Sequence, residues 1–459
     1  MDTVTVQNWK RSITYHPHSV EKITSVEDIQ RIVKDPARYP TPVRAKGSHH
    51  STTRCVVAEG GTVLDMSGFS RILSIDKDKC EITMQAGVLY IDAAKELERS
   101  GLQFFVNVEI GNLTVGSGAC GGTKDASYFS KANGWEFGQV ASYCIGVKTV
   151  QADGTLLEVT EESDAELMAA MRSSYGMLGV IYEVTYKVKP IVALAVEHKA
   201  YHVDDFADRL ETLIAGERSM MLYMLPFLDT VVVEYRSDGP GKVNPGSWQW
   251  RLRNYVWKTV GPGYSMALGY IMPIRPVRYA LINLFNRVTV WVLTTILKDD
   301  DSSPADQIIH YAPTAGFASY TFSIWAFPRE HYPRALRDYF AFCKQYRKDN
   351  NYRCDLLNVG YHIIQDRQSL FSYTRRGPVL TLDPVATGLP GWEGFLVAYN
   401  QFCSEHNGTP LFNQTGSLTG HQAQRAFGEE IAVFQSYRRK MDPADRFYTD
   451  FFRRLFEGE

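Results

Sequence analysis

The hydrophobic and polar positions of the first 190 residues predict short strands that alternate with helices. Apolar residues at helical spacing follow the cap-forming Thr24-Ser25 pair, and a second helical stretch stops before Gly101. Alternating or continuous apolar residues predict strands. The expected helices cover 25–33, 92–99 and 165–171, and the expected strands cover 42–45, 61–66, 80–86, 140–151, 156–159 and 180–188. The Asp153-Gly154 turn makes a hairpin of two of these strands, and the pattern is typical of an α+β fold.

The pattern changes after Pro190, which predicts a second domain. The stretch 238–245 (DGPGKVNP) is dense in Gly and Pro and predicts a loop. Further along, alternation predicts strands and helical spacing predicts helices. The expected strands cover 319–327, 356–364 and 379–382, and the expected helices cover 333–346, 392–406 and 422–437.

The window 239–298 contains no Asp or Glu, although it carries eight Lys and Arg residues and nine Trp, Tyr and Phe residues. Its end, 277–297, has the pattern of an amphipathic or buried helix. Arg278 and Arg287 interrupt that helix, which argues against a transmembrane span. Three interpretations remain: a cap helix whose basic face meets solvent, a peripheral membrane or lipid-substrate contact through 245–297, or a nucleic-acid contact.

Composition excludes several classes of protein. The chain has 459 residues, 44% hydrophobic and 22% charged, which are ordinary globular values. The net charge of −2 argues against a global electrostatic contact with nucleic acid. Seven cysteines without a CxxC pair indicate neither a disulfide framework nor a metal site. The first ten residues lack the apolar core of a signal peptide. We therefore expect a cytoplasmic protein, with membrane association as the alternative.

Three glycine-punctuated turns are the candidates for chemistry. The first, 43–51, is a short strand that enters a polar turn whose successive N–H groups would suit a pyrophosphate. The second, 113–123, is so rich in Gly and small residues that something flat is expected to approach its backbone closely. The third, 174–185, leads into a strand. None is a P-loop or a GxGxxG turn opening a long helix, so a Rossmann dinucleotide site is not expected.

The order and spacing of these turns resemble the vanillyl-alcohol oxidase/p-cresol methylhydroxylase family of FAD enzymes. Gly-Ser-x-His-Ser at 47–51 comes first, Thr-Val-Gly at 114–116 follows about sixty residues later, and Gly-x-Leu-Gly-Val-Ile at 176–181 comes about sixty after that. The aldonolactone and alditol oxidase branch is the most similar. Supporting residues are Asn8-Trp9, Gly87-Val88 with Leu97, ADGT at 152–155, DPADRF at 442–447 and 451–455. The match is strong over residues 5–190 and clear over 430–456, and residues 191–429 match only in their general pattern.

The resemblance implies a bound FAD and the residues that hold it. The matching positions are Arg44, Lys46, Gly47, Ser48, His49, His50, Ser51, Thr114, Val115, Gly116, Ser117, Cys120, Gly121, Gly122, Gly179, Val180 and Ile181. The histidine that often carries the flavin covalently matches His50, whereas the Gly that usually precedes it is His49 here. Asn112-Leu113 stands where relatives place a second, cysteine link, so a double attachment is not expected. Gly116 lies where relatives leave room for dioxygen, which favours an oxidase.

The substrate side departs from the branch. Alditol oxidases share a Glu-x-Arg pair on a cap strand, and the nearest segment here, 354–358, has Asp355 in place of the Glu and no Arg. The strand that should carry a Lys matches 410–414 (PLFNQ). Oxidation of an alcohol needs a base near the flavin. The candidate catalytic residues are Asp355, His362, Asp383 and Lys124, each of which could equally make a structural hydrogen bond.

The resemblance predicts an α+β, two-domain FAD-dependent oxidoreductase similar to D-arabinono-1,4-lactone oxidases. An FAD-binding domain over 1–190 would be completed by 415–459, and a substrate (cap) domain would cover 191–414. Hydride would pass from a hydroxyl-bearing carbon of a sugar-like or natural-product alcohol to FAD, and dioxygen would be reduced to hydrogen peroxide. The alternatives are a dehydrogenase with a quinone or protein acceptor, and a flavin-holding cyclase or lyase with little net redox turnover.

Overall fold

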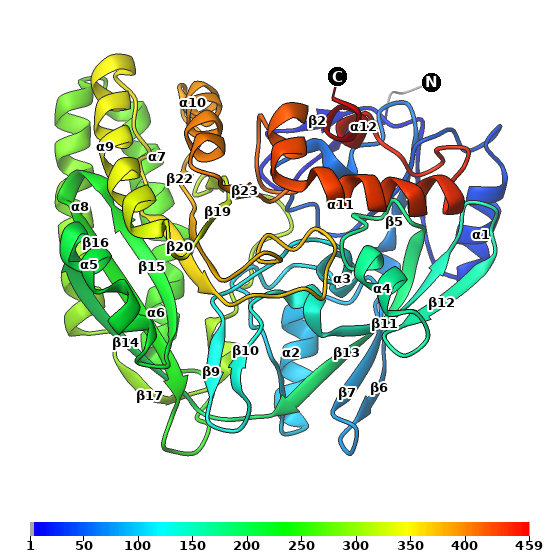
Figure 1. Ribbon diagram of the computed structural model, residues 1–459, viewed down its shortest axis with the longest axis horizontal. Helices are drawn as coiled ribbons and strands as arrows, with labels where there is room; N and C mark the ends of the chain where they lie inside the picture. The colour runs from blue at the N-terminus through cyan, green and yellow to red at the C-terminus, as the bar shows by residue number, and fades with distance from the viewer. Residues whose placement is uncertain (1–3, 459) are drawn as a thin grey trace.

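The computed structural model describes residues 4–458, which form two lobes that meet at a central cavity (Figure 1). One lobe contains a six-stranded antiparallel sheet ordered β12-β11-β13-β7-β6, with β8 paired to the end of β13. Their bounds are β6 Ile72–Asp76, β7 Glu81–Gln85, β8 Leu102–Phe104, β11 Cys144–Val150, β12 Leu156–Thr160 and β13 Val180–Pro190. A smaller parallel sheet contains β3 Ser19–Lys22, β5 Thr62–Asp65 and β4 Val43–Lys46.

The helices of this lobe pack around the two sheets. They are α1 Val26–Lys34, α2 Tyr90–Arg99, α3 Val115–Cys120 and α4 Ala165–Met171. The last helices of the chain, α11 Gly420–Met441 and α12 Asp450–Glu457, return to this lobe, where they contact α4 and the short turn Arg54–Val56. The two chain ends therefore lie on the same lobe (Figure 1).

The other lobe is an eight-stranded antiparallel sheet ordered β17-β14-β16-β15-β20-β21-β19-β23. The strands are β14 Leu194–His202, β15 Ser219–Leu225, β16 Thr230–Asp238, β17 Asp299–Ser302, β19 Trp325–Pro328, β20 Asn358–Ile363, β21 Val379–Leu382 and β23 Thr409–Pro410. Helices α5 Val203–Ile214 and α9 Tyr332–Asn350 pack against each other and against this sheet, and α10 Trp392–Glu405 contacts α11. Smaller pairings are β1 Val6–Gln7 with β2 Thr14–Tyr15, β9 Tyr128–Ser130 with β10 Gly134–Glu136, and β18 Thr321–Phe322 with β22 Val385–Ala386.

Most predicted elements are confirmed within a few residues, and three differ. The run 140–151 begins as a 3-10 turn, Val140–Tyr143, because Gln139 and Ser142 turn aside to hydrogen-bond Asp366. The strand expected over 319–327 is divided into β18 and β19, since Ser323 N donates to the carbonyl of Pro384. The glycine-rich stretch 113–123 contains the short helix α3, whose small residues let it pack closely. A run of apolar residues without interruption gives no sign in the sequence of where such a strand is broken.

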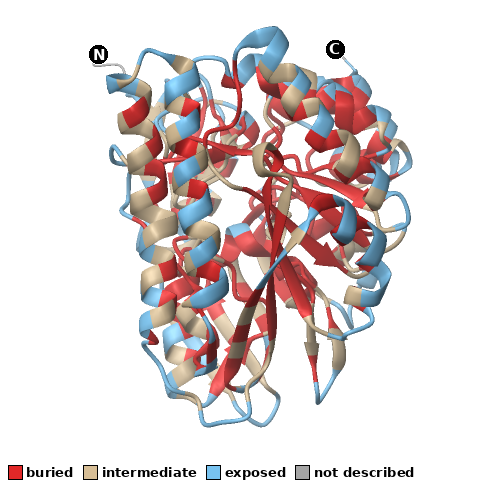
Figure 2. Cartoon of the chain, turned by 90° about the vertical axis from the view of Figure 1, so that its left-hand side faces the viewer, coloured by how far each residue is buried: buried red, intermediate tan, exposed pale blue. Residues whose placement is uncertain are grey.

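The acid-free window folds as a helical layer on the second lobe. It contains α6 Trp248–Tyr255, a π-helical turn Val256–Val260, α7 Gly261–Ile271 and α8 Arg275–Thr295. Figure 2, which looks onto this lobe, shows exposed and buried residues alternating along the covering helices. Within 4–458, no helix is both long enough and apolar enough to cross a bilayer.

Candidate active site

The turn after β4 presents a row of free backbone donors to the central cavity. Residues 47–51 all line this cavity. None of their five N–H groups donates a hydrogen bond to any residue between 4 and 458. A row of free N–H groups facing a cavity suits the oxygens of a phosphate. The turn therefore fits the pyrophosphate that the resemblance implies.

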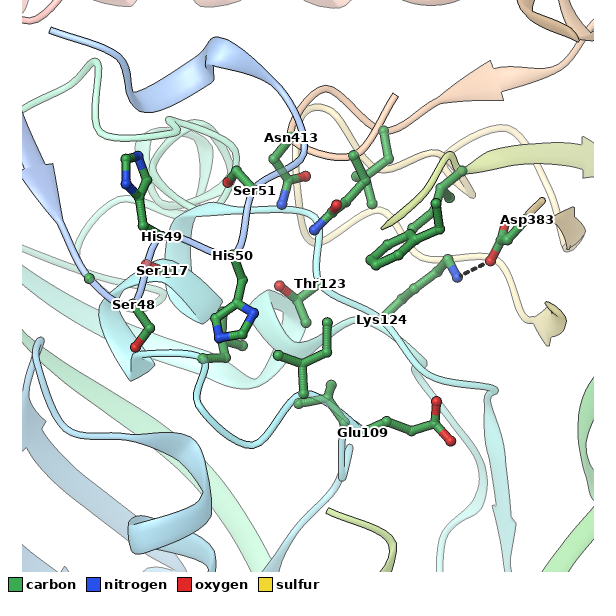
Figure 3. Close-up of a pocket in the computed structure, with 18 of the residues that line it drawn as sticks. Ser48, His49, His50, Ser51, Glu109, Ser117, Thr123, Lys124, Asp383 and Asn413 are labelled. Atoms are coloured by element: carbon green, nitrogen blue, oxygen red, sulfur yellow. Dashed lines mark hydrogen bonds and ion pairs between the residues drawn. The ribbon is translucent and has the colours of Figure 1, made fainter. Parts of the chain in front are cut away.

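His49 adopts the backbone conformation that the family's usual glycine would provide. Its φ is 58°, in the left-handed region where a non-Gly residue is uncommon. Nδ1 of His49 lies 3.1 Å from the carbonyl of Gln7, and its ring turns away from His50 (Figure 3). His49 therefore holds a left-handed conformation that Gly adopts without strain, at a position where the resemblance expects Gly.

His50 is a half-buried imidazole on the cavity wall. Its ring stacks on Trp9 with centroids 5.0 Å apart, and its Nε2 has no hydrogen-bond partner in the described chain. Burial, with a smaller effect of His49, lowers the pKa of His50 to about 4. The ring is therefore neutral at pH 7, which is the nucleophilic form that a bond to the flavin would need.

The second glycine-rich segment lies directly against the first turn. A Cβ on Gly47 would lie 2.4 Å from Thr114 Oγ1, so the two segments touch because residue 47 has no side chain. Thr114 and Ser117 both line the cavity, and their hydroxyl oxygens are 2.8 Å apart. These contacts bring two of the three expected FAD segments together.

The structure gives Gly116 a different role from the one expected. A Cβ at this position would lie 2.7 Å from Ala86 Cβ and 3.0 Å from the Ala86 carbonyl oxygen. Gly116 is also not among the residues that line the cavity. Its small size serves the packing of α3 against the end of β7, so the argument for an oxidase from room for dioxygen is not supported here.

The other residues that match the family's FAD positions do not line the cavity. Arg44 is buried and donates to the carbonyls of Gly176 and Phe447, which ties the third segment and the C-terminal segment to β4. Lys46 pairs with Asp65 at 3.1 Å. The remaining positions do not line the cavity: Val115, Cys120, Gly121, Gly122, Gly179, Val180 and Ile181.

Lys124 and Asp383 meet at the end of the cavity away from the turn. Lys124 Nζ is 2.8 Å from Asp383 Oδ2, and the two side chains are 4% and 1% exposed (Figure 3). The ammonium also lies 3.7 Å from the ring centroid of Tyr361. Asp383 Oδ1 has no partner in the described chain. Burial raises the pKa of Asp383 to about 6 despite the opposing effect of Lys124, so a free carboxylate oxygen is available near neutral pH.

Asp355 and His362 lie away from this cavity. Thr387 donates to both oxygens of Asp355, from its N–H at 2.8 Å and its hydroxyl at 2.5 Å. His362 belongs to β20, where Val359 and Tyr361 line the cavity, so alternation turns His362 to the opposite face. There its ring lies 5.3 Å from that of Trp135. Of the four candidate catalytic residues, the structure therefore brings only Lys124 and Asp383 together.

Sequence reasoning missed a charged group on the cavity wall. Glu109 lines the cavity, and its Oε1 lies 2.5 Å from Arg253 Nη2 of α6. Arg253 Nε also pairs with Glu234 at 2.9 Å, and Glu234 Oε1 lies 2.6 Å from Arg236 Nη2. Glu234-Tyr235-Arg236 is a Glu-x-Arg pair on a strand of the second lobe, β16, whereas the resemblance places the nearest segment at 354–358. The pair does not line the central cavity, so it does not replace the missing substrate contact.

Comparisons with known proteins agree with this geometry. Residues 17–160 match the family model described as "FAD binding domain". L-gulonolactone oxidase of Mus musculus is 22% identical, with 99% of this chain and 98% of that protein covered. L-gulono-1,4-lactone dehydrogenase of Mycobacterium tuberculosis is 26% identical over 53% of this chain and 54% of that protein. The crystal structure of cholesterol oxidase from B. sterolicum superposes with a TM-score of 0.75 at 15% identity, over 98% of this chain and 96% of that one, which shows a shared fold.

Proposed function

We propose that the chain is an FAD-dependent oxidoreductase of the vanillyl-alcohol oxidase type, and that it oxidises a hydroxyl-bearing carbon of a sugar-like, lactone-forming alcohol. The observation that carries the proposal is the Lys124–Asp383 pair. Asp383, whose Oδ1 has no partner in the described chain, lines the same cavity as residues 47–51. The names of the lactone oxidase and lactone dehydrogenase relatives support the substrate class.

In this proposal each part of the cavity has one task. The bound FAD would supply the hydride acceptor. The turn 47–51 and Thr114 would hold its pyrophosphate. Asp383 Oδ1 would accept the hydroxyl proton, and Lys124 would keep that carboxylate ionised through its charge. Tyr361 would restrict the ammonium to one side of the cavity.

The electron acceptor needs its own test. We propose dioxygen, which gives hydrogen peroxide, and the alternative is a quinone or protein acceptor, because the relatives include both an oxidase and a dehydrogenase. L-Gulono-1,4-lactone added without oxygen should bleach the flavin absorbance, and readmitted air should restore it within one turnover time. Bleaching followed by slow recovery would favour the dehydrogenase. No bleaching across a panel of lactones and polyols would overturn the proposal and favour the cyclase or lyase alternative.

We also propose that the chain divides into an FAD-binding domain (1–190 with 415–459) and a cap domain (191–414).

We propose in addition a covalent bond between His50 and FAD. The neutral, unpaired imidazole of His50 supports the bond. Acid precipitation should leave the yellow colour in the pellet, and in His50→Ala the colour should move to the supernatant. Release of the flavin from the unmodified protein would remove the bond but keep FAD as the cofactor.

A peripheral membrane contact through 245–297 is a second proposal, supported by the surface of α7 and α8. Large apolar side chains there are exposed, among them Tyr270, Ile271, Ile274, Leu284 and Trp291. The surrounding segment is basic and acid-free, which complements anionic lipids. The protein should sediment with phosphatidylglycerol vesicles, and Trp291→Ala with Leu284→Ala should reduce that binding. Equal sedimentation with phosphatidylcholine vesicles and with no vesicles would overturn this proposal.

A further inference from the structure

A second cavity, here called the apolar cavity, lies between α8 and the α6–α7 segment. Its volume is about 150 Å³. The wall from α8 contains Phe285, Val288, Val292 and Leu293, and the opposite wall contains Val260 and Pro262. Two charged residues also line the cavity and both are already paired: Thr387 occupies both carboxylate oxygens of Asp355, and Arg253 pairs with Glu109 and Glu234. Such a lining is suited to a hydrocarbon group.

The apolar cavity shares its inner wall with the central cavity. Trp257, Tyr320 and Val385 line both. The rings of Trp257 and Tyr320 are 6.0 Å apart, and Trp257 belongs to the π-helical turn Val256–Val260. Single π-helical turns occur often at functional sites, where they displace a side chain from the regular helical position. Only side chains therefore separate the apolar cavity from the chamber that contains Lys124 and Asp383.

The outer end of the apolar cavity reaches the surface of α8. Val288 lines the cavity and is 52% exposed. One turn away on the same helix, Leu284 is 59% exposed and does not line the cavity. The surrounding segment, 239–298, carries no acidic residue. An apolar chain that enters beside Val288 would therefore meet hydrocarbon side chains on its way inward.

We propose that the apolar cavity binds the hydrocarbon tail of the substrate, so that the substrate is an alcohol or sugar-like head joined to an alkyl or prenyl chain. The head would pass Trp257 and Tyr320 to reach Asp383, and the tail would stay between α8 and the α6–α7 segment. This inference rests on the proposed function for the fate of the head. The affinity for the tail is a separate property and can be measured without turnover.

The test measures binding to the FAD-loaded protein by calorimetry, with n-alkan-1-ols from butanol to octanol as probes. Burial of each added methylene should tighten binding about fourfold until the cavity is full. Val292→Trp should fill the cavity and remove this dependence on chain length. Leu284→Trp places the same ring on the outer face of the same helix and should retain the dependence. If Val292→Trp does not fold, Val288→Arg at the mouth serves as the second variant and should weaken the longer alcohols most.

The outcomes separate the two proposals. Affinity that does not change with chain length, or a length dependence that survives in both cavity variants, would overturn the tail site. If a short lactone still bleaches the flavin in that case, the proposed function stands alone. A normal length dependence in a protein whose flavin no alcohol or lactone reduces would overturn the proposed function and leave the tail site in place.

Discussion

Lys124 Nζ lies 2.8 Å from Asp383 Oδ2, and this ion pair joins the chain just after α3 to the end of β21. Thr381 Oγ1 donates to the same carboxylate oxygen at 3.1 Å, so Oδ1 alone remains free. Both charged groups are almost completely buried. A buried charge that loses its partner is costly, so each side chain constrains the other. Lys124 and Thr381 therefore hold the carboxylate in one orientation through Oδ2.

Replacement of Asp383 should slow flavin reduction. Asp383→Asn removes the proton acceptor but keeps the size of the side chain, and general-base catalysis contributes roughly 10²- to 10⁴-fold. We expect a decrease of that size in the anaerobic bleaching rate with L-gulono-1,4-lactone. Asp366→Asn is the matched control, because Asp366 is a buried carboxylate bonded to Gln139 and Ser142 outside both cavities. Equal rates in the two variants would remove Asp383 from the mechanism.

The rate of flavin reduction should depend on pH through Asp383. Burial raises the pKa of this carboxyl to about 6, and a base works only when it is ionised. The rate should therefore be maximal above pH 7 and fall about tenfold for each pH unit below 6. Stopped-flow bleaching between pH 4.5 and 8 measures this profile. Asp383→Asn should lose the inflection, and an inflection that persists in that variant would assign it to another group.

The left-handed conformation of His49 should determine how well FAD is held. In a His50→Ala background, where the flavin is not covalently attached, His49→Gly should bind FAD as tightly as its parent. His49→Val should bind more weakly, by about 5- to 160-fold, because a β-branched residue in this conformation costs about 1–3 kcal/mol. Titration with FAD, followed by flavin fluorescence, gives both affinities. If the His49→Val variant binds FAD as tightly as the His49→Gly variant, the conformation of the turn does not limit binding.

The glycine-rich turns could be predicted from sequence because their function lies in local backbone. The contacts across the cavity could not, although Lys124 and Asp383 were each candidates from the sequence. Lys124 and Asp383 are 259 positions apart, and Arg253 lies 144 positions from Glu109. No periodicity relates such pairs, and only the pairing of the two lobes brings them together. The role expected for Asp355 rested on a Glu-x-Arg spacing, whereas the spacing occurs at Glu234 and Arg236 on another strand of the same sheet.

Arg253 should stabilise the junction between the two lobes. It lies between the carboxylates of Glu109 and Glu234, and burial raises the pKa of Glu109 even beside this guanidinium. Arg253→Met keeps the aliphatic stem but leaves two buried carboxylates without this cation, which costs about 3–5 kcal/mol in comparable cases. Urea unfolding should show a loss of that order.

The matched control for Arg253 is an exposed pair of the same type. Arg334 and Asp338 are 3.5 Å apart on α9, with side chains 87% and 42% exposed, so Arg334→Met should change the unfolding free energy by less than about 1 kcal/mol. Adding Glu109→Gln to Arg253→Met should restore part of the lost stability, since it removes the carboxylate that loses its ion-pair partner. If the double variant is less stable than Arg253→Met, the arginine acts through packing rather than through its charge.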